Sequence, residues 1–278
     1  MKILVVASGS EGNATVFESR GTRVLVDAGI GPFALRRILD ESGLSGGLDA
    51  VVITHAHQDH FGHALRYARK ARVPVWITEG TARQLDLYGR RPERVSMYGA
   101  RDAFAIGALT ITPTPLPHDA PQVALVVSDG VRKAAIATDL GEVPPRLAEH
   151  IAGCDVLLIE SNHEPEMLAC GPYPESLKRR VASARGHLSN VQTHELLCRL
   201  ASRTHTVVLM HLSRTNNRPD IALETARDAL SGRRVRLLAA PTRDVLVVDA
   251  DLPSFCPRLP GRRRAVLKVA YDQLSFWT

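Results

Sequence analysis

Residues 54 to 60 read Thr54-His55-Ala56-His57-Gln58-Asp59-His60, and this stretch decides how the rest of the chain is interpreted. It follows the apolar run 50–53, which predicts a short buried strand. If the chain leaves that strand extended, His55 and His57 point the same way, because side chains alternate along extended backbone. The carboxylate and the third imidazole then lie in the next turn. Imidazole is the commonest protein ligand for zinc and carboxylates join it readily, so the spacing predicts a metal site with a second metal beside the first.

The ligands that a two-metal site still lacks come from distant parts of the chain. Each of three residues follows directly after an apolar, strand-like run: His118, Asp139 and His211. Side chains at strand ends converge on one rim of a sheet, where rigid elements hold them in place. Any one of them alone would be read as an ordinary polar cap of a strand. Together with the first cluster, they indicate a dinuclear site.

Composition sets the broad class of the protein. The chain has 278 residues, of which 45% are hydrophobic, so it is long enough to bury a substantial core and is not disordered overall. No apolar run reaches the ~18 residues that a membrane span needs. The run 1–7 breaks at once into Ser8-Gly9-Ser10-Glu11-Gly12-Asn13, which predicts a first strand and its turn rather than a signal peptide. Four widely spaced cysteines predict reduced thiols in a cytoplasmic protein, and the net charge of +6 weakly favours an anionic partner.

Strand-like and helix-like runs alternate along the chain, which predicts an α/β fold. Apolar residues at helical spacing predict helices at 33–42, 60–71, 174–184, 190–202 and 221–230. Strands are predicted at 24–26, 50–53, 74–77, 109–112, 123–128, 133–137, 155–160, 206–210, 235–238 and 245–248. We expect a catalytic domain over 1–250 and a basic tail over 251–278. The run Arg262-Arg263-Arg264 in that tail either binds DNA or is a solvated face.

The motif set resembles the metallo-β-lactamase superfamily, and Asp27 in Leu25-Val26-Asp27-Ala28-Gly29 resembles its early structural aspartate. The resemblance implies a four-layer αβ/βα sandwich, with two mixed sheets between helices and the site at one edge. It also implies two divalent metal ions, zinc or manganese, with a hydroxide between them. The implied ligands are His55, His57 and His118 for one ion, Asp59, His60 and His211 for the other, and Asp139 bridging both. Asp27 would orient one of these ligands.

Further sequence features indicate which branch of the superfamily the chain resembles. Gly186-His187-Leu188-Ser189, followed by a predicted helix, a strand and His211, resembles the closing half of ribonuclease Z-type phosphodiesterases. By that match His187 is a catalytic residue alongside Asp59, and it donates a proton to the leaving oxygen or binds the scissile phosphate. The interval from His118 to Asp139 is too short for the tRNA-gripping arm of ribonuclease Z, and no interval holds the inserted domain of the β-CASP enzymes.

The remaining resemblance is to the YycJ/WalJ-like branch of small bacterial nucleases. The stretches that carry it are Ser8-Gly9-Ser10-Glu11-Gly12-Asn13, Pro117-His118-Asp119-Ala120, Thr138-Asp139-Leu140-Gly141, Glu160-Ser161-Asn162-His163, Gly186-His187-Leu188-Ser189-Asn190 and Asn216-Asn217. It implies a DNA exonuclease working 5′ to 3′ on duplex ends.

Four more residues belong to the expected site. Asn162 and His163 follow the predicted strand 155–160, so they should contact substrate or orient a ligand. Ser10 and Asn13 lie in the Gly-rich turn, which either shapes the backbone or faces the substrate. Two other functions stay open: a glyoxalase II-like or lactonase-like ester hydrolase, which has no need of His187, and a metal-dependent binding protein with little activity.

Overall fold

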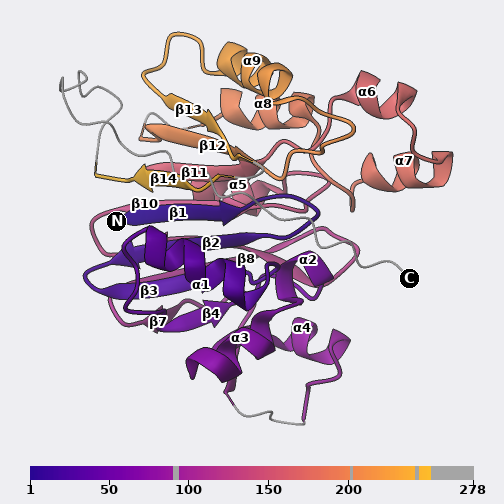
Figure 1. Ribbon diagram of the computed structural model, residues 1–278. Coiled ribbons are helices and arrows are strands. Elements are labelled where there is room, and N and C mark those ends of the chain that lie inside the picture. The colour runs from indigo at the N-terminus through magenta and orange to yellow at the C-terminus, as the bar shows by residue number, and fades with distance from the viewer. Residues whose placement is uncertain (90–93, 201–202, 242–243, 252–278) are drawn as a thin grey trace.

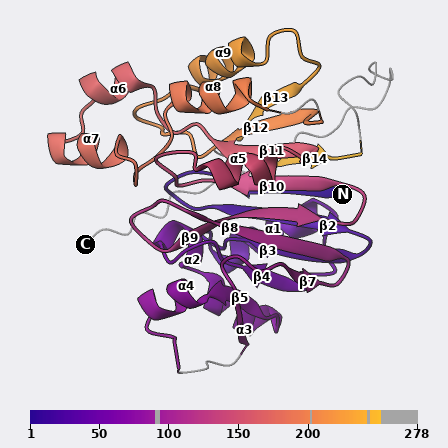
Figure 2. The same cartoon turned by 180° about the vertical axis from the view of Figure 1, so that it is seen from behind.

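Two sheets packed face to face form the centre of the molecule. The computed structural model describes residues 1–89, 94–200, 203–241 and 244–251. These residues build two seven-stranded mixed sheets with helices on their outer faces (Figures 1 and 2). The arrangement confirms the expected αβ/βα sandwich.

The first sheet has the strand order β14-β1-β2-β3-β4-β5-β6. Its strands are β1 (Lys2–Ala7), β2 (Ala14–Ser19), β3 (Thr22–Val26), β4 (Ala50–Val52), β5 (Val75–Thr78), β6 (Val95–Tyr98) and β14 (Leu246–Asp249). Strands β3 to β6 are parallel to one another, whereas β14, β1, β2 and β3 pair antiparallel. The helices of this half are α1 (Pro32–Glu41), α2 (Gln58–Phe61), α3 (Ala64–Ala71) and α4 (Glu79–Gln84).

The second sheet has the order β13-β12-β11-β10-β9-β8-β7. Its strands are β7 (Phe104–Ile106), β8 (Leu109–Leu116), β9 (Gln122–Ser128), β10 (Lys133–Ala137), β11 (Val156–Glu160), β12 (Thr206–Met210) and β13 (Arg236–Ala239). Its outer face is covered by α5 (Pro145–Ile151), α8 (Asn190–Cys198) and α9 (Pro219–Ala229). The pair α6 (Pro165–Cys170) and α7 (Glu175–Val181) projects from the connection between β11 and α8 (Figure 1).

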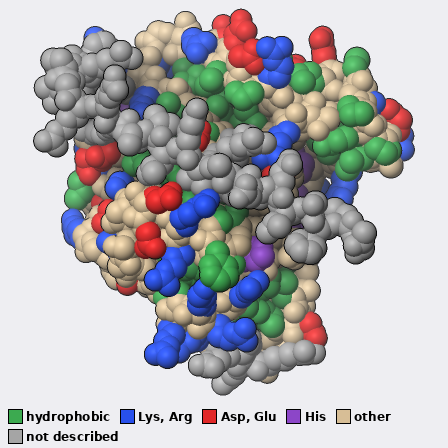
Figure 3. Space-filling model, viewed as in Figure 1, with side chains coloured by type: hydrophobic (Ala, Val, Ile, Leu, Met, Phe, Trp, Pro, Cys, Tyr) green, Lys and Arg blue, Asp and Glu red, His purple; other side chains and the backbone are tan. Residues whose placement is uncertain are grey.

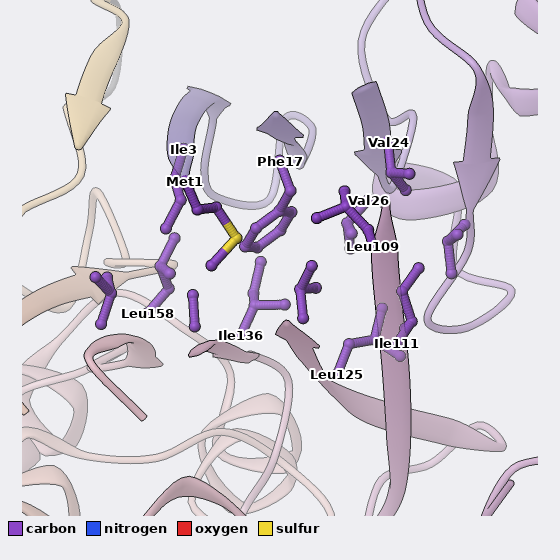
Figure 4. Close-up of a cluster of buried hydrophobic side chains, with 14 of the residues drawn as sticks. Met1, Ile3, Phe17, Val24, Val26, Leu109, Ile111, Leu125, Ile136 and Leu158 are labelled. Carbon is purple, nitrogen blue, oxygen red and sulfur yellow. The ribbon is translucent and has the colours of Figure 1, made fainter. Parts of the chain in front are cut away.

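The core lies between the sheets because alternate residues of each strand point inward. Along β1, Ile3 joins the cluster between the sheets and Leu4 joins the layer under α1 and α3. Phe17, Leu125 and Leu158 meet in the same central layer (Figure 4). This alternation is the period of two that an extended backbone imposes, and it fixes the rim at which the strands end.

One predicted helix is wrong in its boundaries, and the reason bears on the site. The expected helix over 60–71 is two helices, α2 and α3. The carbonyl of Asp59, which a continuous helix would use, accepts from the backbone N–H of Asn13 at 2.7 Å. The backbone N–H of His63 donates instead to the carbonyl of Ala28 at 3.0 Å. The chain therefore bends at this point, and the ligand-bearing turn is attached to two other loops.

Other differences are smaller. The helices expected to reach residues 184 and 202 end at Val181 and Cys198. The sequence reading missed β2, β6, β7, α4, α5 and α6. The expectations for the tail fall outside the described residues, apart from Asp251, whose Oδ2 lies 2.7 Å from the N-terminal ammonium of Met1. Within the described ranges no helix is long and apolar enough to cross a bilayer.

Candidate metal centre

The seven side chains predicted as metal ligands gather at one edge of the sandwich. They follow the carboxyl ends of β4, β8, β10 and β12, on the side of the molecule where α2 and α7 lie (Figure 1). Two of them, Asp139 and His211, have left-handed backbone with φ of 58° and 54°. Asp27, which follows β3, has φ of 61°. Residues other than glycine rarely adopt this backbone conformation, and where they do, they often lie at functional sites.

His55, His57 and His118 form the first group, with ligand atoms within 4.8 Å of one another. Nδ1 of His57 lies 3.3 Å from Nε2 of His118, whose Nδ1 contacts the carbonyl of Arg185 at 3.0 Å. Nδ1 of His55 contacts Thr54 Oγ1 at 3.1 Å, and its Nε2 is buried with no hydrogen-bond partner among the described residues. Burial, and next the neighbouring His60, lower the pKa of His55 well below its usual value. The imidazole is therefore neutral, which is the form that binds metals.

Asp59, His60 and His211 form the second group. Oδ2 of Asp59 lies 3.5 Å from His60 Nε2 and 3.8 Å from His211 Nε2. Asp139 lies beside both groups. Its ligand atom is within 4.8 Å of those of His55 in the first group and His60 in the second, and its Oδ1 is 3.4 Å from His211 Nδ1. Burial alone would raise the pKa of Asp139, but the charges of His211 and His60 lower it well below the usual range. A carboxylate that remains ionised between two ligand groups is suited to bridge two metals.

Asp27 and Asn13 hold this turn in place. Oδ2 of Asp27 lies 2.7 Å from His60 Nδ1, which leaves Nε2 of that histidine to face the cluster. Oδ1 of Asp27 accepts from the backbone N–H of Thr54 at 2.9 Å. The Asn13 amide donates to Asp59 Oδ2 at 3.2 Å and to the carbonyl of Gly9 at 3.1 Å. Asn13 thus both shapes the Gly-rich turn and contacts a predicted ligand.

Glu160 also lies in the candidate site, although the sequence did not single it out. It is fully buried at the end of β11, and its Oε1 lies 2.9 Å from His187 Nδ1 and 2.8 Å from His211 Nδ1. Its Oε2 accepts from the backbone N–H groups of Leu140 and Leu188. Burial alone would raise the pKa of Glu160, but His187 and His211 outweigh burial and lower it to about 2. The signal was present, because Glu160 directly follows an apolar strand just as the predicted ligands do.

The three remaining predicted residues differ in how they are placed relative to the site. The amide of Asn162 donates to the backbone carbonyl of His211 at 2.8 Å and so fixes a predicted ligand. Ser10 lines the site cavity. His163 is buried near Glu160 and His187 but does not line that cavity, and burial lowers its pKa to about 4. Ser10 therefore faces the cavity, Asn162 contacts a predicted ligand, and His163 does neither.

The cavity over the cluster has a volume of about 170 Å³ and is walled on one side by α7 and the loop that follows it. Arg180, Arg185 and His187 line this wall.

Asp119 is a further residue of the site that the sequence did not predict. Its Oδ1 lies 3.2 Å from His57 Nε2, and its Oδ2 accepts a hydrogen bond from Arg180 Nε at 3.0 Å. Burial alone would raise the pKa of Asp119, but the hydrogen bond from Arg180 and the charge of His118 lower it. The site is thus a recess with a carboxylate-rich floor and a cationic wall.

The donor set fits divalent metals. Imidazole nitrogens and carboxylate oxygens in this mixture suit zinc, or manganese where oxygens predominate. Nε2 of His55 and Nε2 of His211 are both buried with no hydrogen bond among the described residues. Since an unpaired buried polar atom is costly, a metal at these atoms would compensate them.

Comparison with known proteins agrees with this geometry. Residues 22–212 match the family model described as the beta-lactamase superfamily domain. The chain belongs to the metallo-β-lactamase superfamily. It is 33% identical over 240 residues to exodeoxyribonuclease WalJ of Streptococcus pneumoniae, covering 83% of this chain and 88% of that protein. It is 31% identical over 223 residues to exodeoxyribonuclease YycJ of Bacillus anthracis, covering 78% and 84%.

These relatives support the YycJ/WalJ-like branch and a metal-dependent hydrolase. Among solved structures, the metallo-β-lactamase fold protein YhfI from Bacillus subtilis superimposes with a TM-score of 0.69 at 17% identity, covering 89% of this chain and 99% of that one. At that identity the likeness shows the fold alone.

Proposed function

We propose that this metal-dependent hydrolase is a DNA exonuclease that cleaves phosphodiester bonds, with 5′ to 3′ polarity as the family resemblance implies. The observation that carries the proposal is His187, which lines the cavity beside the predicted ligands, with Nδ1 3.6 Å from Asp139 Oδ1, and is held by the buried carboxylate of Glu160 at 2.9 Å. The exodeoxyribonuclease relatives support the same choice of substrate.

The predicted ligands would hold two ions in this reading. His55, His57 and His118 would hold one, Asp59, His60 and His211 the other, and Asp139 would contact both. Two divalent ions bound there would activate water for attack on phosphorus and offset the negative charge of the phosphate.

His187 would supply the proton that the departing oxygen needs. Burial lowers the pKa of His187, but the charge and hydrogen bond of Glu160 more than compensate and raise it above the usual value. This shift favours the protonated ring, which a donor requires. Because Nδ1 contacts Glu160, Nε2 is the nitrogen left for the substrate.

Two arginines on the cavity wall would bind the substrate phosphate. Guanidinium groups pair with phosphate oxygens through two parallel hydrogen bonds. Arg180 is oriented by Asp119, and the carbonyl of Arg185 contacts His118 Nδ1. The Arg180 guanidinium is thus connected to the ligand cluster through Asp119, whereas an uncharged thioester would make no use of such a cation.

The proposal is tested with three substrates and protein loaded with manganese or zinc. We expect hydrolysis of bis-p-nitrophenyl phosphate and of end-labelled duplex DNA, with little action on a thioester. Duplexes labelled at the 5′ or the 3′ end report polarity by which label is released first as a nucleotide. Thioester hydrolysis without phosphodiester hydrolysis would replace the proposal with a glyoxalase II-like function. Metal binding with no hydrolysis of any of the three would leave a binding protein.

The role of His187 has its own prediction. A positioned acid contributes ~10²–10⁴-fold to such a step, so His187→Ala should slow DNA cleavage by about that factor while metal content is unchanged. The loss should be much smaller for bis-p-nitrophenyl phosphate, because nitrophenolate leaves without protonation. His194→Ala, at a half-buried histidine of α8 that pairs with Asp228 and does not line the cavity, is the control. Equal losses on the two phosphodiesters would show phosphate binding rather than proton donation.

A further inference from the structure

Two neighbouring helices outside the cavity carry a cluster of exposed cations. We define the basic face as the exposed basic residues of α1, of α3 and of the residue that ends α3: Arg36, Arg37, Arg66, Arg69, Lys70 and Arg72. Figure 3 shows Lys and Arg side chains gathered over the lower half of the molecule, where Figure 1 places α1 and α3.

The packing of the two helices explains why these cations share one side. Leu35 and Ile38 of α1 are buried in the same apolar layer on the first sheet as Tyr67 and Ala68 of α3. The opposite faces of both helices are therefore left to solvent on the same side of the molecule. A helix of the length of α1 is about 15 Å long, over which duplex DNA carries roughly nine phosphates.

The charge of the basic face is largely uncompensated. Among the described residues, the only member with a carboxylate partner is Arg36, whose Nε lies 3.7 Å from Asp40. Lys70 lies over the ring of Phe33, 3.8 Å from its centroid. Arg37, Arg66, Arg69 and Arg72 form no ion pair with any described residue.

Several arginines elsewhere in the described part of the chain are paired with carboxylates. Arg180 is held by Asp119, Arg218 by Asp220, and Arg132 by Asp155 and Asp251. The contrast matters because an exposed cation without an internal partner is available to a phosphate at no cost in broken ion pairs.

The two helices that carry the basic face begin next to the turn that bears the predicted ligands. The loop between Asp27 and α1 is tied to the ligand turn, since the backbone N–H of Ala28 donates to the carbonyl of His60 at 2.6 Å. The backbone N–H of His63, one residue before α3, donates to Ala28 at 3.0 Å. Both helices therefore start at the rim of the site and run away from it as fixed extensions.

We propose that the basic face binds the phosphate backbone of the DNA that extends beyond the cavity, and so makes the protein favour long DNA over short phosphodiesters. This inference rests on the proposed function. DNA suits the face better than a membrane does, because α1 and α3 expose six cations but few large apolar side chains, of which Phe33 at 72% is the most exposed.

The test removes three charges from the face and three from elsewhere. The variant is Arg37→Gln with Arg66→Gln and Arg69→Gln. The control is Arg146→Gln with Arg199→Gln and Arg227→Gln, which removes the same charge from exposed positions on the outer side of the second sheet. Binding of the metal-loaded protein to a fluorescent duplex with phosphorothioate-protected ends is measured across a salt series, beside hydrolysis of bis-p-nitrophenyl phosphate.

The face variant should bind the duplex more weakly. Its negative slope of log affinity against log salt should become shallower by about 0.9 for each lost contact, hence by about 2.7. Its hydrolysis of bis-p-nitrophenyl phosphate should equal that of the wild type. The control should change neither, and replacing the same three arginines by lysine should retain the slope.

Binding to phosphatidylglycerol vesicles is measured beside duplex binding. Three results would overturn the proposal: an unchanged slope in the face variant, equal losses in the face variant and the control, or a loss of vesicle binding with duplex binding unchanged. The two proposals fail separately. Face-dependent DNA binding by a protein that cleaves no phosphodiester would refute only the nuclease function. DNA cleavage with normal duplex binding by the face variant would refute only the face.

Discussion

At the scale of single residues, the site depends on buried carboxylates that hold histidine rings in place. Glu160 connects two histidines, one beside the substrate and one among the predicted ligands. Asp27 and Asp139 occupy left-handed backbone at strand ends, where each such conformation costs on the order of 1–3 kcal/mol. For Asp27, hydrogen bonds with Thr54 and His60 offset that cost and fix the direction in which the carboxylate points.

Glu160→Gln should lower DNA hydrolysis by about 10- to 100-fold and reduce metal content, because it removes the charge that orients His187 and His211. Glu166→Gln on α6, which is exposed, is the matched control. Metal content by plasma emission and kcat on duplex DNA are the two measurements. Normal values for both would mean that Glu160 only fills the end of its strand.

Asp129 permits a prediction about pH that is independent of the metal centre. Burial alone would raise its pKa, but hydrogen bonds from the backbone N–H groups of Arg132 and Val131 and from Ser19 lower it from 3.8 to about 2. A lowered folded-state pKa means that the stabilisation is present above about pH 4 and is lost as the pH falls toward 2.

Asp129→Asn should therefore destabilise the protein by on the order of 1–2 kcal/mol at neutral pH and by progressively less as the pH falls toward 2. Urea unfolding at several pH values measures the difference. Asp102→Asn, at an exposed turn position, should have little effect at any pH. A constant difference across the pH range would contradict the assignment.

The residue pattern alone predicted which side chains would meet, but not which partners hold them. His118 and Asp139 follow apolar runs, and the end of a strand is visible in sequence. Glu160 also follows an apolar run, but the sequence pattern counts it as the last residue of the predicted strand 155–160. Asp119 acts through His57 and Arg180, far apart in the chain, and no local pattern indicates such a contact.

At the scale of elements, loops with many backbone hydrogen bonds connect the helices to the site. The clearest case is the start of α8, where Ser189 accepts from the backbone N–H of Gln192 and the Gln192 side chain accepts from that of Ser189. This capping box fixes the loop that carries His187.

Ser189→Ala should cost about 1 kcal/mol of stability, the usual effect of losing a helix N-cap. Thermal or urea unfolding measures it, and Ser176→Ala on the exposed side of α7 should be close to neutral. A loss of DNA cleavage larger than the loss of stability explains would indicate that the cap also positions His187.

Element boundaries were the part of the fold that sequence predicted least well. Period-two and period-3.6 patterns located most strands and the longer helices, since these patterns reflect burial. The break between α2 and α3 could not be predicted, because it arises from Asn13 taking the carbonyl of Asp59. Short elements such as α4 and α6 bury too few apolar residues to leave a pattern.

At the scale of the whole molecule, the apolar layer between the two sheets holds the site rims together. Phe17 is fully buried there (Figure 4). Phe17→Ala should cost about 3–5 kcal/mol, through lost burial and the cavity left behind. Phe33→Ala, at a side chain 72% exposed, should change stability by less than about 0.5 kcal/mol. Urea unfolding of both variants measures the contrast, and similar values would mean that the sheets repack around the cavity.

The pairing of β1 with β14 has a consequence for how the protein is made. Ile3 lies opposite Val248, so the strand that is synthesised near the start is completed by one synthesised far later. At about 5–20 residues per second, roughly 12–50 s pass on the ribosome before the partner emerges. Throughout that time β1 presents an open edge, which is a template for pairing with other chains. A chaperone should therefore be needed to shield the open edge of newly made protein until translation has passed residue 249.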